Sequence, residues 1–320
     1  MKKFLFPILI ATLLFSACTS RNDKNFMKAT QLVKENKINL ALKIYNDILR
    51  NDPTYVSALV NRALIYEKLG EEKMAQEDYE RALDLAPNQV DLLNNVGAFY
   101  LDHKRPQLAK YYFSKALEIQ PEYTPAYVNR ANANEKLDKI DDALEDLHVA
   151  LSLEPENIEI ILSQAMLFYK KAMFAKALDG YSEVLAARPQ DYRTYYRRAL
   201  AFKMLGAYQN AFNDLNTALS MNNSYIPAIF ARAELLFDKG DFESALSDLD
   251  VIKTIDNQYV PAYEFSGDIW AIEDPVKAVS NYIVAKKLDP ANTKRYDAKI
   301  KLMRSDRGRQ AVIKKKLERI

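Results

Sequence analysis

The stretch VSALVNRALIYEKLGEEKMAQEDYERALDLAPNQ, residues 56–89, decides the fold. It has a proline two residues before its end, and prolines recur at residues 53, 87, 121, 155 and 189, at intervals of 34 residues. Five prolines in phase at this spacing predict a solenoid of helix-turn-helix units, because a period of 20–50 residues is the signature of repeat architectures.

The same register runs through most of the chain. It gives units at residues 22–55, 56–89, 90–123, 124–157, 158–191, 192–225, 226–259 and 260–292. Position 8 of every unit is small: Ala29, Ala63, Gly97, Ala131, Ala165, Ala199, Ala233 and Gly267. Position 20 is Ala in each full-length unit, and position 24 is always large and apolar. Small residues let two helix backbones approach closely while a large neighbour fills the remaining space.

This pattern resembles the tetratricopeptide repeat family. The resemblance implies an all-α, right-handed α-solenoid of about eight repeats spanning residues 22–292, with residues 293–320 as a basic C-terminal capping helix or tail. Gly70, Gly206 and Gly240, at position 15, suit the left-handed residue that ends a first helix. In the tail, Tyr296, Ile300 and Met303 fall at helical spacing and could cover the apolar face of the last unit.

The chain opens MKKFLFPILIATLLFSAC, in which two lysines precede a short apolar run ending before Cys18. This run of twelve residues, broken only by Pro7 and Thr12, is too short to span a bilayer as a helix and fits a signal peptide, residues 1–17. The stretch resembles a bacterial lipoprotein signal, although Phe15 stands where Leu is usual. An ordinary signal peptide with an incidental cysteine is the alternative. The resemblance implies lipidation of Cys18, a linker over residues 18–24, and, from Thr19, the outer rather than the inner membrane of the cell envelope.

The composition and the charge distribution limit the classes of function and partner that the chain can have. Apolar residues make up 49% and charged residues 28%, which suits a folded chain. Net charge is +2, yet residues 293–320 hold 11 Lys/Arg against 3 Asp/Glu. The basic tail could cap the array, contact anionic lipid or envelope polymer, or meet nucleic acid, and an exported acidic array makes nucleic acid the weakest of these. We therefore expect no nucleic-acid partner.

Nothing in the sequence predicts catalysis. His103 and His148 have no partner at ligand spacing, Cys18 is the single cysteine, and no phosphate-binding glycine loop or nucleophile elbow occurs. We accordingly expect no enzyme activity, no cofactor, no metal and no small-molecule substrate.

Function should then lie on a surface. In the tetratricopeptide family the first helices of the units line a concave groove, with positions 2, 5, 6, 9, 12 and 13 facing it. The candidate partner-binding residues at these positions are Asn129, Asn132, Tyr169, Arg193, Tyr196, Arg197, Lys203, Phe230 and Glu234. Glu264, Phe265 and Phe237 also fall there, and the two phenylalanines could instead pack against the neighbouring unit.

One variant of the family binds the C-terminal carboxylate of a ligand through five polar residues spread over three units. Here those positions hold Val128, Asn132, Ser163, Arg193 and Arg197, so the asparagine and both basic positions match and the other two do not.

These observations predict a protein-interaction scaffold of the bacterial envelope, anchored to the membrane by its N-terminal lipid, that binds an extended segment or helix of another protein. The alternative is a constitutive structural subunit of an envelope assembly or secretion machine, held through its outer face or its tail.

Overall fold

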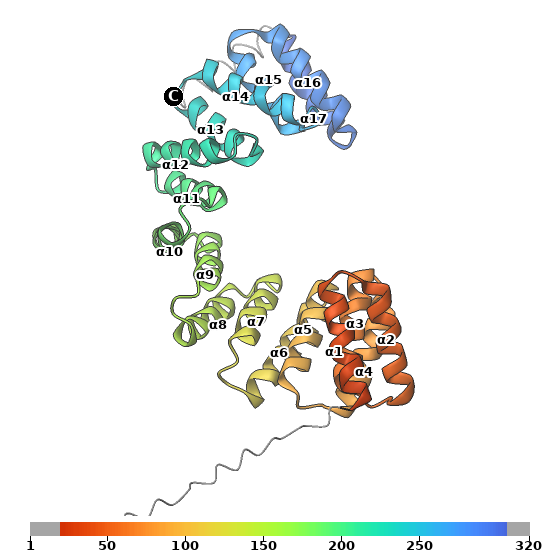
Figure 1. The fold of residues 1–320 in the computed structure, drawn as a ribbon. Coiled ribbons are helices and arrows are strands. Elements are labelled where there is room, and N and C mark those ends of the chain that lie inside the picture. The colour runs from red at the N-terminus through yellow and green to blue at the C-terminus, as the bar shows by residue number, and fades with distance from the viewer. Residues whose placement is uncertain (1–19, 306–320) are drawn as a thin grey trace, which may run out of the picture. The chain divides into compact units, whose positions relative to one another are not determined.

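The computed structural model describes residues 20–305, and every regular element in that range is helical. The chain divides into two compact units, residues 1–139 and 140–320, which are described separately (Figure 1). The boundary falls inside the predicted repeat 124–157, between its two helices. The predicted all-α helix-hairpin fold is confirmed.

The first unit contains three helical hairpins and one further helix. Its helices are α1 (Arg21–Lys34), α2 (Ile38–Asn51), α3 (Val56–Leu69), α4 (Glu72–Leu85), α5 (Val90–Asp102), α6 (Pro106–Ile119) and α7 (Thr124–Lys136).

The second unit begins with a single helix, continues through four hairpins, and closes with a short 3₁₀ turn and a last helix. Its elements are α8 (Ile140–Leu153), α9 (Ile158–Lys170), α10 (Phe174–Ala187), α11 (Tyr192–Met204), α12 (Tyr208–Met221), α13 (Ile226–Asp238), α14 (Phe242–Ile255), α15 (Val260–Glu273), α16 (Pro275–Leu288), η1 (Pro290–Asn292) and α17 (Thr293–Met303).

The N-terminal prediction needs one correction. Helix α1 begins at Arg21, inside the segment 18–24 that was expected to be a linker. Ser20 caps the helix: its hydroxyl accepts from the Asp23 amide, and the Asp23 carboxylate accepts from the Ser20 amide. The predicted signal peptide, residues 1–17, and Cys18 lie outside the described residues.

Left-handed residues end the first helices at position 15 of seven units. Gly70, Gly206 and Gly240 have φ between 74° and 83°, as predicted. The equivalent residues Asn36, Lys104, Asp138 and Ala172 adopt φ of 58–59° without being glycine. The register therefore imposes the conformation, and the side chain at position 15 only makes it easier or harder to adopt.

Close helix approach explains the small residues at position 8. On α5, a Cβ added to Gly97 would lie 2.4 Å from Cε1 of Phe113, which is fully buried on α6. On α15, a Cβ at Gly267 would lie 2.5 Å from Cε1 of Tyr282 on α16. In both hairpins the ring at position 24 fills the space that a larger residue would need.

Ion pairs also join the two helices of several hairpins. Asp78 of α4 accepts two bonds from the Arg62 guanidinium of α3, at 2.6 and 2.7 Å. Arg198 and Asp214 form the same fork between α11 and α12, and so do Arg232 and Asp248 between α13 and α14. The carboxylates are buried, so each fork fixes the angle between its two helices.

Helix α17 covers the end of the last hairpin. Tyr296, Ile300 and Met303 are buried against α16, as their spacing predicted. The remainder of the predicted tail, residues 306–320, lies outside the described residues.

Candidate functional site

The nine candidate residues fall on two units. Asn129 and Asn132 belong to α7 in the first unit. The other seven belong to the second unit, on three first helices: Tyr169 on α9, Arg193, Tyr196, Arg197 and Lys203 on α11, and Phe230 and Glu234 on α13. We call the side chains of α9, α11 and α13 at these positions the first-helix surface.

Lys203 and Glu234 are bound to each other. The Lys203 ammonium donates to the Glu234 carboxylate at 2.8 Å, joining α11 to α13, and both side chains are partly exposed. Each neutralises the other, so the pair offers a partner polar edges and little net charge. Their first effect is to hold neighbouring repeats together.

Aromatic rings connect the same helices. Tyr225, just before α13, meets Tyr192 and Tyr196 of α11 edge-on, with ring centroids 5.0 and 5.4 Å away. Burial raises the pKa of Tyr196, and neighbouring tyrosines and Glu234 raise it further. Tyr196, one of the candidate groove residues, is therefore half-buried between repeats.

The candidate phenylalanines also pack between neighbouring repeats. Phe230 of α13 lies 5.7 Å from Phe265 of α15, and Phe237 lies 5.3 Å from the same ring. The alternative that Phe237 and Phe265 pack against the neighbouring unit is thus confirmed. These rings are partly buried in contacts between repeats, which limits the area that each can offer to a ligand.

Two arginines remain available on α11. Arg193 is exposed and lies over the Tyr192 ring at 5.2 Å. Arg197, one turn later, is partly buried and forms no hydrogen bond or ion pair with residues 20–305. Burial raises the pKa of Tyr181 to about 12, and the nearby Arg197 charge opposes that rise. The Arg197 guanidinium therefore lies near tyrosine side chains, and none of its five N–H donors binds a carboxylate of residues 20–305.

The first unit carries a different polar surface. The Asn129 side-chain amide donates to the side-chain oxygen Oδ1 of Asn94 at 3.0 Å, and Asn132 is exposed one turn further along α7. Asparagines recur at position 6 as Asn61, Asn95 and Asn129. Each amide can both donate and accept, which suits contact with a peptide backbone.

The five-residue set that binds a C-terminal carboxylate is incomplete in this chain. Ser163 donates its hydroxyl to the Glu159 carbonyl of its own helix at 2.8 Å. Val128 has no polar group, and it lies with Asn132 on the first unit. Only Arg193 and Arg197, four residues apart on α11, form a basic pair within one described unit.

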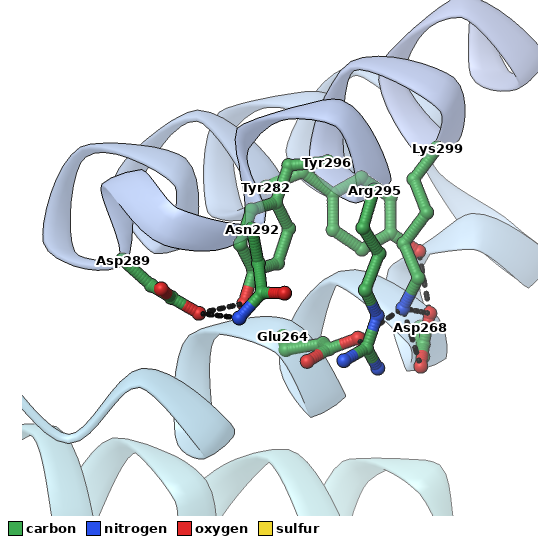
Figure 2. Close-up of polar contacts among 8 residues, drawn as sticks. All are labelled: Glu264, Asp268, Tyr282, Asp289, Asn292, Arg295, Tyr296 and Lys299. Atoms are coloured by element: carbon green, nitrogen blue, oxygen red, sulfur yellow. Dashed lines mark hydrogen bonds and ion pairs between the residues drawn. The ribbon is translucent and has the colours of Figure 1, made fainter.

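One residue that was predicted to face the groove instead forms ion pairs with side chains of the same chain (Figure 2). Glu264 of α15 binds Arg295 and, at 2.6 Å, Lys299 of α17. Lys299 also reaches Asp268 at 3.0 Å, and Asp268 accepts from the Tyr282 hydroxyl at 2.7 Å. The expectation that Glu264 faces a partner is wrong, because α17 lies beside α15 and neutralises it. The four-residue spacings in Glu264–Asp268 and Arg295–Lys299 were the available signal.

No catalytic or metal centre appears among the described residues. His103 bonds the Phe99 carbonyl through Nδ1 at 2.7 Å, as a helix-end side chain does. No group of three or more His, Cys, Asp and Glu side chains in residues 20–305 could hold a metal ion. Within the same range no helix combines the length and the apolar character needed to cross a bilayer.

Comparison with known proteins agrees with this architecture. The family model of the tetratricopeptide repeat matches residues 56–89. Human tetratricopeptide repeat protein 6 is 36% identical over 102 residues, which is 32% of this chain and 18% of that protein. The chain thus spans less than a fifth of that relative's length.

Two solved structures are similar in fold. A tetratricopeptide repeat protein from Parabacteroides merdae has a TM-score of 0.59 at 17% identity, over 77% of this chain and 97% of that one. YrrB, a tetratricopeptide protein described as having an unusual peptide-binding site, has a TM-score of 0.51 at 20% identity, over 59% and 97%. The described helices form a helical-hairpin repeat protein with the fold of these tetratricopeptide repeat structures, and residues 56–89 match the tetratricopeptide repeat itself.

Proposed function

We propose that this chain is a non-enzymatic scaffold of the bacterial envelope that binds a segment of a partner protein on its first-helix surface, centred on Arg193 and Arg197. The observation that carries the proposal is the state of Arg197. Its guanidinium is partly buried and makes no ion pair within residues 20–305, whereas Arg62, Arg198 and Arg232 all bind carboxylates.

The physical argument rests on what a half-buried guanidinium needs. Partial removal from water weakens its hydration, and a carboxylate from a ligand can replace that hydration with two parallel hydrogen bonds. Arg193 lies one turn away and can share the same anion. Tyr196 precedes Arg197 on α11, and Phe230 lies on the neighbouring first helix, α13. Aromatic and arginine side chains dominate binding energy at protein interfaces.

The surface therefore favours a segment that brings one acidic group and a few apolar side chains. The Lys203–Glu234 pair, further along α11, adds polar contacts without adding net charge. The asparagines of the first unit could bind the backbone of the same or another segment.

The envelope part of the proposal rests on the N-terminal sequence. Two lysines, a short apolar run and Cys18 support export and lipidation, and Thr19 favours the outer membrane. Because α1 begins at Arg21, only two residues separate it from Cys18, so a lipid there would hold the repeats close to the membrane surface.

Affinity capture tests the binding surface. The tagged, lipidated protein is isolated from detergent-solubilised host membranes beside the variant Arg193→Ala/Arg197→Ala. A matched control, Lys73→Ala/Lys287→Ala, removes the same charge from exposed positions on two second helices. We expect the arginine variant to lose a stoichiometric partner at least tenfold, and the lysine variant to keep it.

Two outcomes would contradict the proposal. Equal capture by both variants would place the contact elsewhere and favour a constitutive subunit held by its outer face or tail. For the anchor, Cys18→Ser should release the protein from membranes into the soluble fraction, and continued retention would refute lipid anchoring.

A further inference from the structure

A second, separate surface lies at the edge of the second unit. A cleft with a volume of about 780 Å³ opens between the start of α12 and the end of α13. Tyr208 and Phe212 of α12 form one wall, and Leu235 and Leu236 of α13 form the other. The polar lining residues are Gln209, Asp238 and Lys239. No candidate residue of the first-helix surface lines it.

Large apolar side chains are exposed at this cleft and in the residues just before it. Tyr208, which lines the cleft, is 57% exposed. Met204 at the end of α11 is 55% exposed and Leu205 in the turn that follows is 50% exposed, although neither lines the cleft. Single exposed apolar residues are ordinary, but three large ones beside an apolar cleft mark a surface that another chain segment covers.

The topology brings the end of α17 to the same edge. Helices α11, α13, α15 and α17 lie side by side in that order, as shown by Lys203–Glu234, Phe230–Phe265 and Lys299–Glu264. Because each intervening helix returns the chain, all four run in the same direction. Their C-terminal ends, including Met303, therefore face the edge at which the cleft opens.

The chain beyond α17 is long enough to reach it. Neighbouring packed helices lie about 8–10 Å apart, so roughly 20 Å separates the end of α17 from that of α13. Eight residues of extended chain cover about 26 Å. Residues 304–311 can therefore cross α15 and deliver the residues that follow to the cleft.

The sequence that follows complements the cleft. Residues 306–320 read DRGRQAVIKKKLERI, in which Ile313, Leu317 and Ile320 stand four and three residues apart among six basic residues. Such spacing places apolar side chains on one face of a helix. Asp238 lines the cleft beside the exposed Lys239. Outside the lining, Glu243 and Glu273 are exposed, and none of the three carboxylates forms an ion pair within residues 20–305, so together they give the edge an acidic rim.

We propose that residues 306–320 dock back onto the second unit, with Ile313 and Leu317 in the Tyr208–Leu236 cleft and the basic residues along the acidic rim. The tail is then a ligand of its own repeat array. It covers a surface that would otherwise be open to an amphipathic basic helix of another protein, and it does so independently of the first-helix surface.

Disulfide trapping tests the docking directly. Cys18 is the single cysteine, so Cys18→Ser gives a clean background for the pair Tyr208→Cys/Leu317→Cys in the full chain. The control pair is Tyr111→Cys/Leu317→Cys, because Tyr111 is also an exposed tyrosine, at 50%, and belongs to the first unit. With oxidised glutathione, we expect an intramolecular disulfide at least tenfold faster for the Tyr208 pair.

Three results would overturn the proposal. Equal rates for the two pairs would show a tail without a preferred site. A Tyr208–Leu317 disulfide that forms only between two molecules, and faster at higher protein concentration, would assign the cleft to a second copy. Absence of any disulfide in a folded protein, judged by its circular dichroism, would leave the cleft to another partner.

A charge variant adds an independent measurement. Asp238→Lys in the Tyr208→Cys/Leu317→Cys protein should slow trapping several-fold, and the effect should shrink at high salt. Glu183→Lys, which changes an exposed acid on α10 of the same unit, should leave the rate unchanged. Equal slowing by both substitutions would show that only the net charge of the protein affects the trapping rate, and it would refute a role for the acidic rim.

Discussion

The contact between Gly97 and Phe113 predicts a substitution whose effect changes sign. In Gly97→Ala the new methyl group would lie 2.4, 2.7 and 2.9 Å from three carbons of the Phe113 ring. That ring is fully buried, so it cannot move into solvent. Overpacking of this kind costs about 2–3 kcal/mol. Alanine favours the helix over glycine by about 1 kcal/mol, which leaves a net loss of about 1–2 kcal/mol.

The sign should reverse when the ring is removed. Leu215 and Leu249 occupy the position of Phe113 in hairpins where Ala already stands in place of Gly97. In a Phe113→Leu background, Gly97→Ala should therefore stabilise α5 by about 1 kcal/mol. The coupling between the two substitutions is then about 2–3 kcal/mol.

Native-state hydrogen exchange is the suitable assay, because a repeat array need not unfold in a single two-state step. Each 1.4 kcal/mol changes the opening equilibrium tenfold, so amides of α5 and α6 should exchange about tenfold faster in Gly97→Ala. Amides of α13 and α14, in the other unit, serve as the internal control. If Gly97→Ala has the same effect in both backgrounds, the close approach does not explain the glycine.

Three further predictions follow from the same structure. Ala172→Gly should raise stability by about 0.5–1 kcal/mol, because Ala172 holds a left-handed φ of 59° that costs a non-glycine residue about 1–2 kcal/mol, and the melting temperature should rise. Asp78→Ala should cost about 3 kcal/mol, because it leaves the partly buried Arg62 guanidinium without its carboxylate, whereas Asp47→Ala in an exposed pair should cost under about 0.5 kcal/mol in chemical denaturation. The pKa of Tyr181 is raised to about 12, chiefly by burial, so its contribution to stability is present below pH 10 and lost as the pH rises through 12. Tyr181→Phe should make alkaline unfolding, followed by circular dichroism, less steep.

The sequence predicted the hairpins well because the cues were local and repeated. A 34-residue period, small residues at position 8 and turns at position 15 are read without knowing the three-dimensional arrangement. The burial of Tyr296, Ile300 and Met303 followed from helical spacing alone. The predicted linker extended too far, to Lys24, because the helix cap formed by Ser20 and Asp23 had not been predicted.

The candidate surface was predicted less completely, because it depends on contacts between repeats. Whether Tyr196 is exposed depends on where Tyr225 of the next repeat places its ring. Glu264 looked available until α17 brought Lys299 beside it. The Arg62–Asp78 fork had a readable signal, since Arg and Asp recur sixteen residues apart at Arg198–Asp214 and Arg232–Asp248.

The central claim is that a partner binds the first-helix surface at Arg193 and Arg197. It is tested most directly by placing a photo-reactive amino acid at position 193 and, as control, at exposed position 287 on α16, then irradiating living cells. We predict one cross-linked protein from position 193, absent from position 287 and lost with Arg197→Ala. Cross-linking from position 287 alone, or cross-linking from position 193 that Arg197→Ala leaves unchanged, would contradict the account.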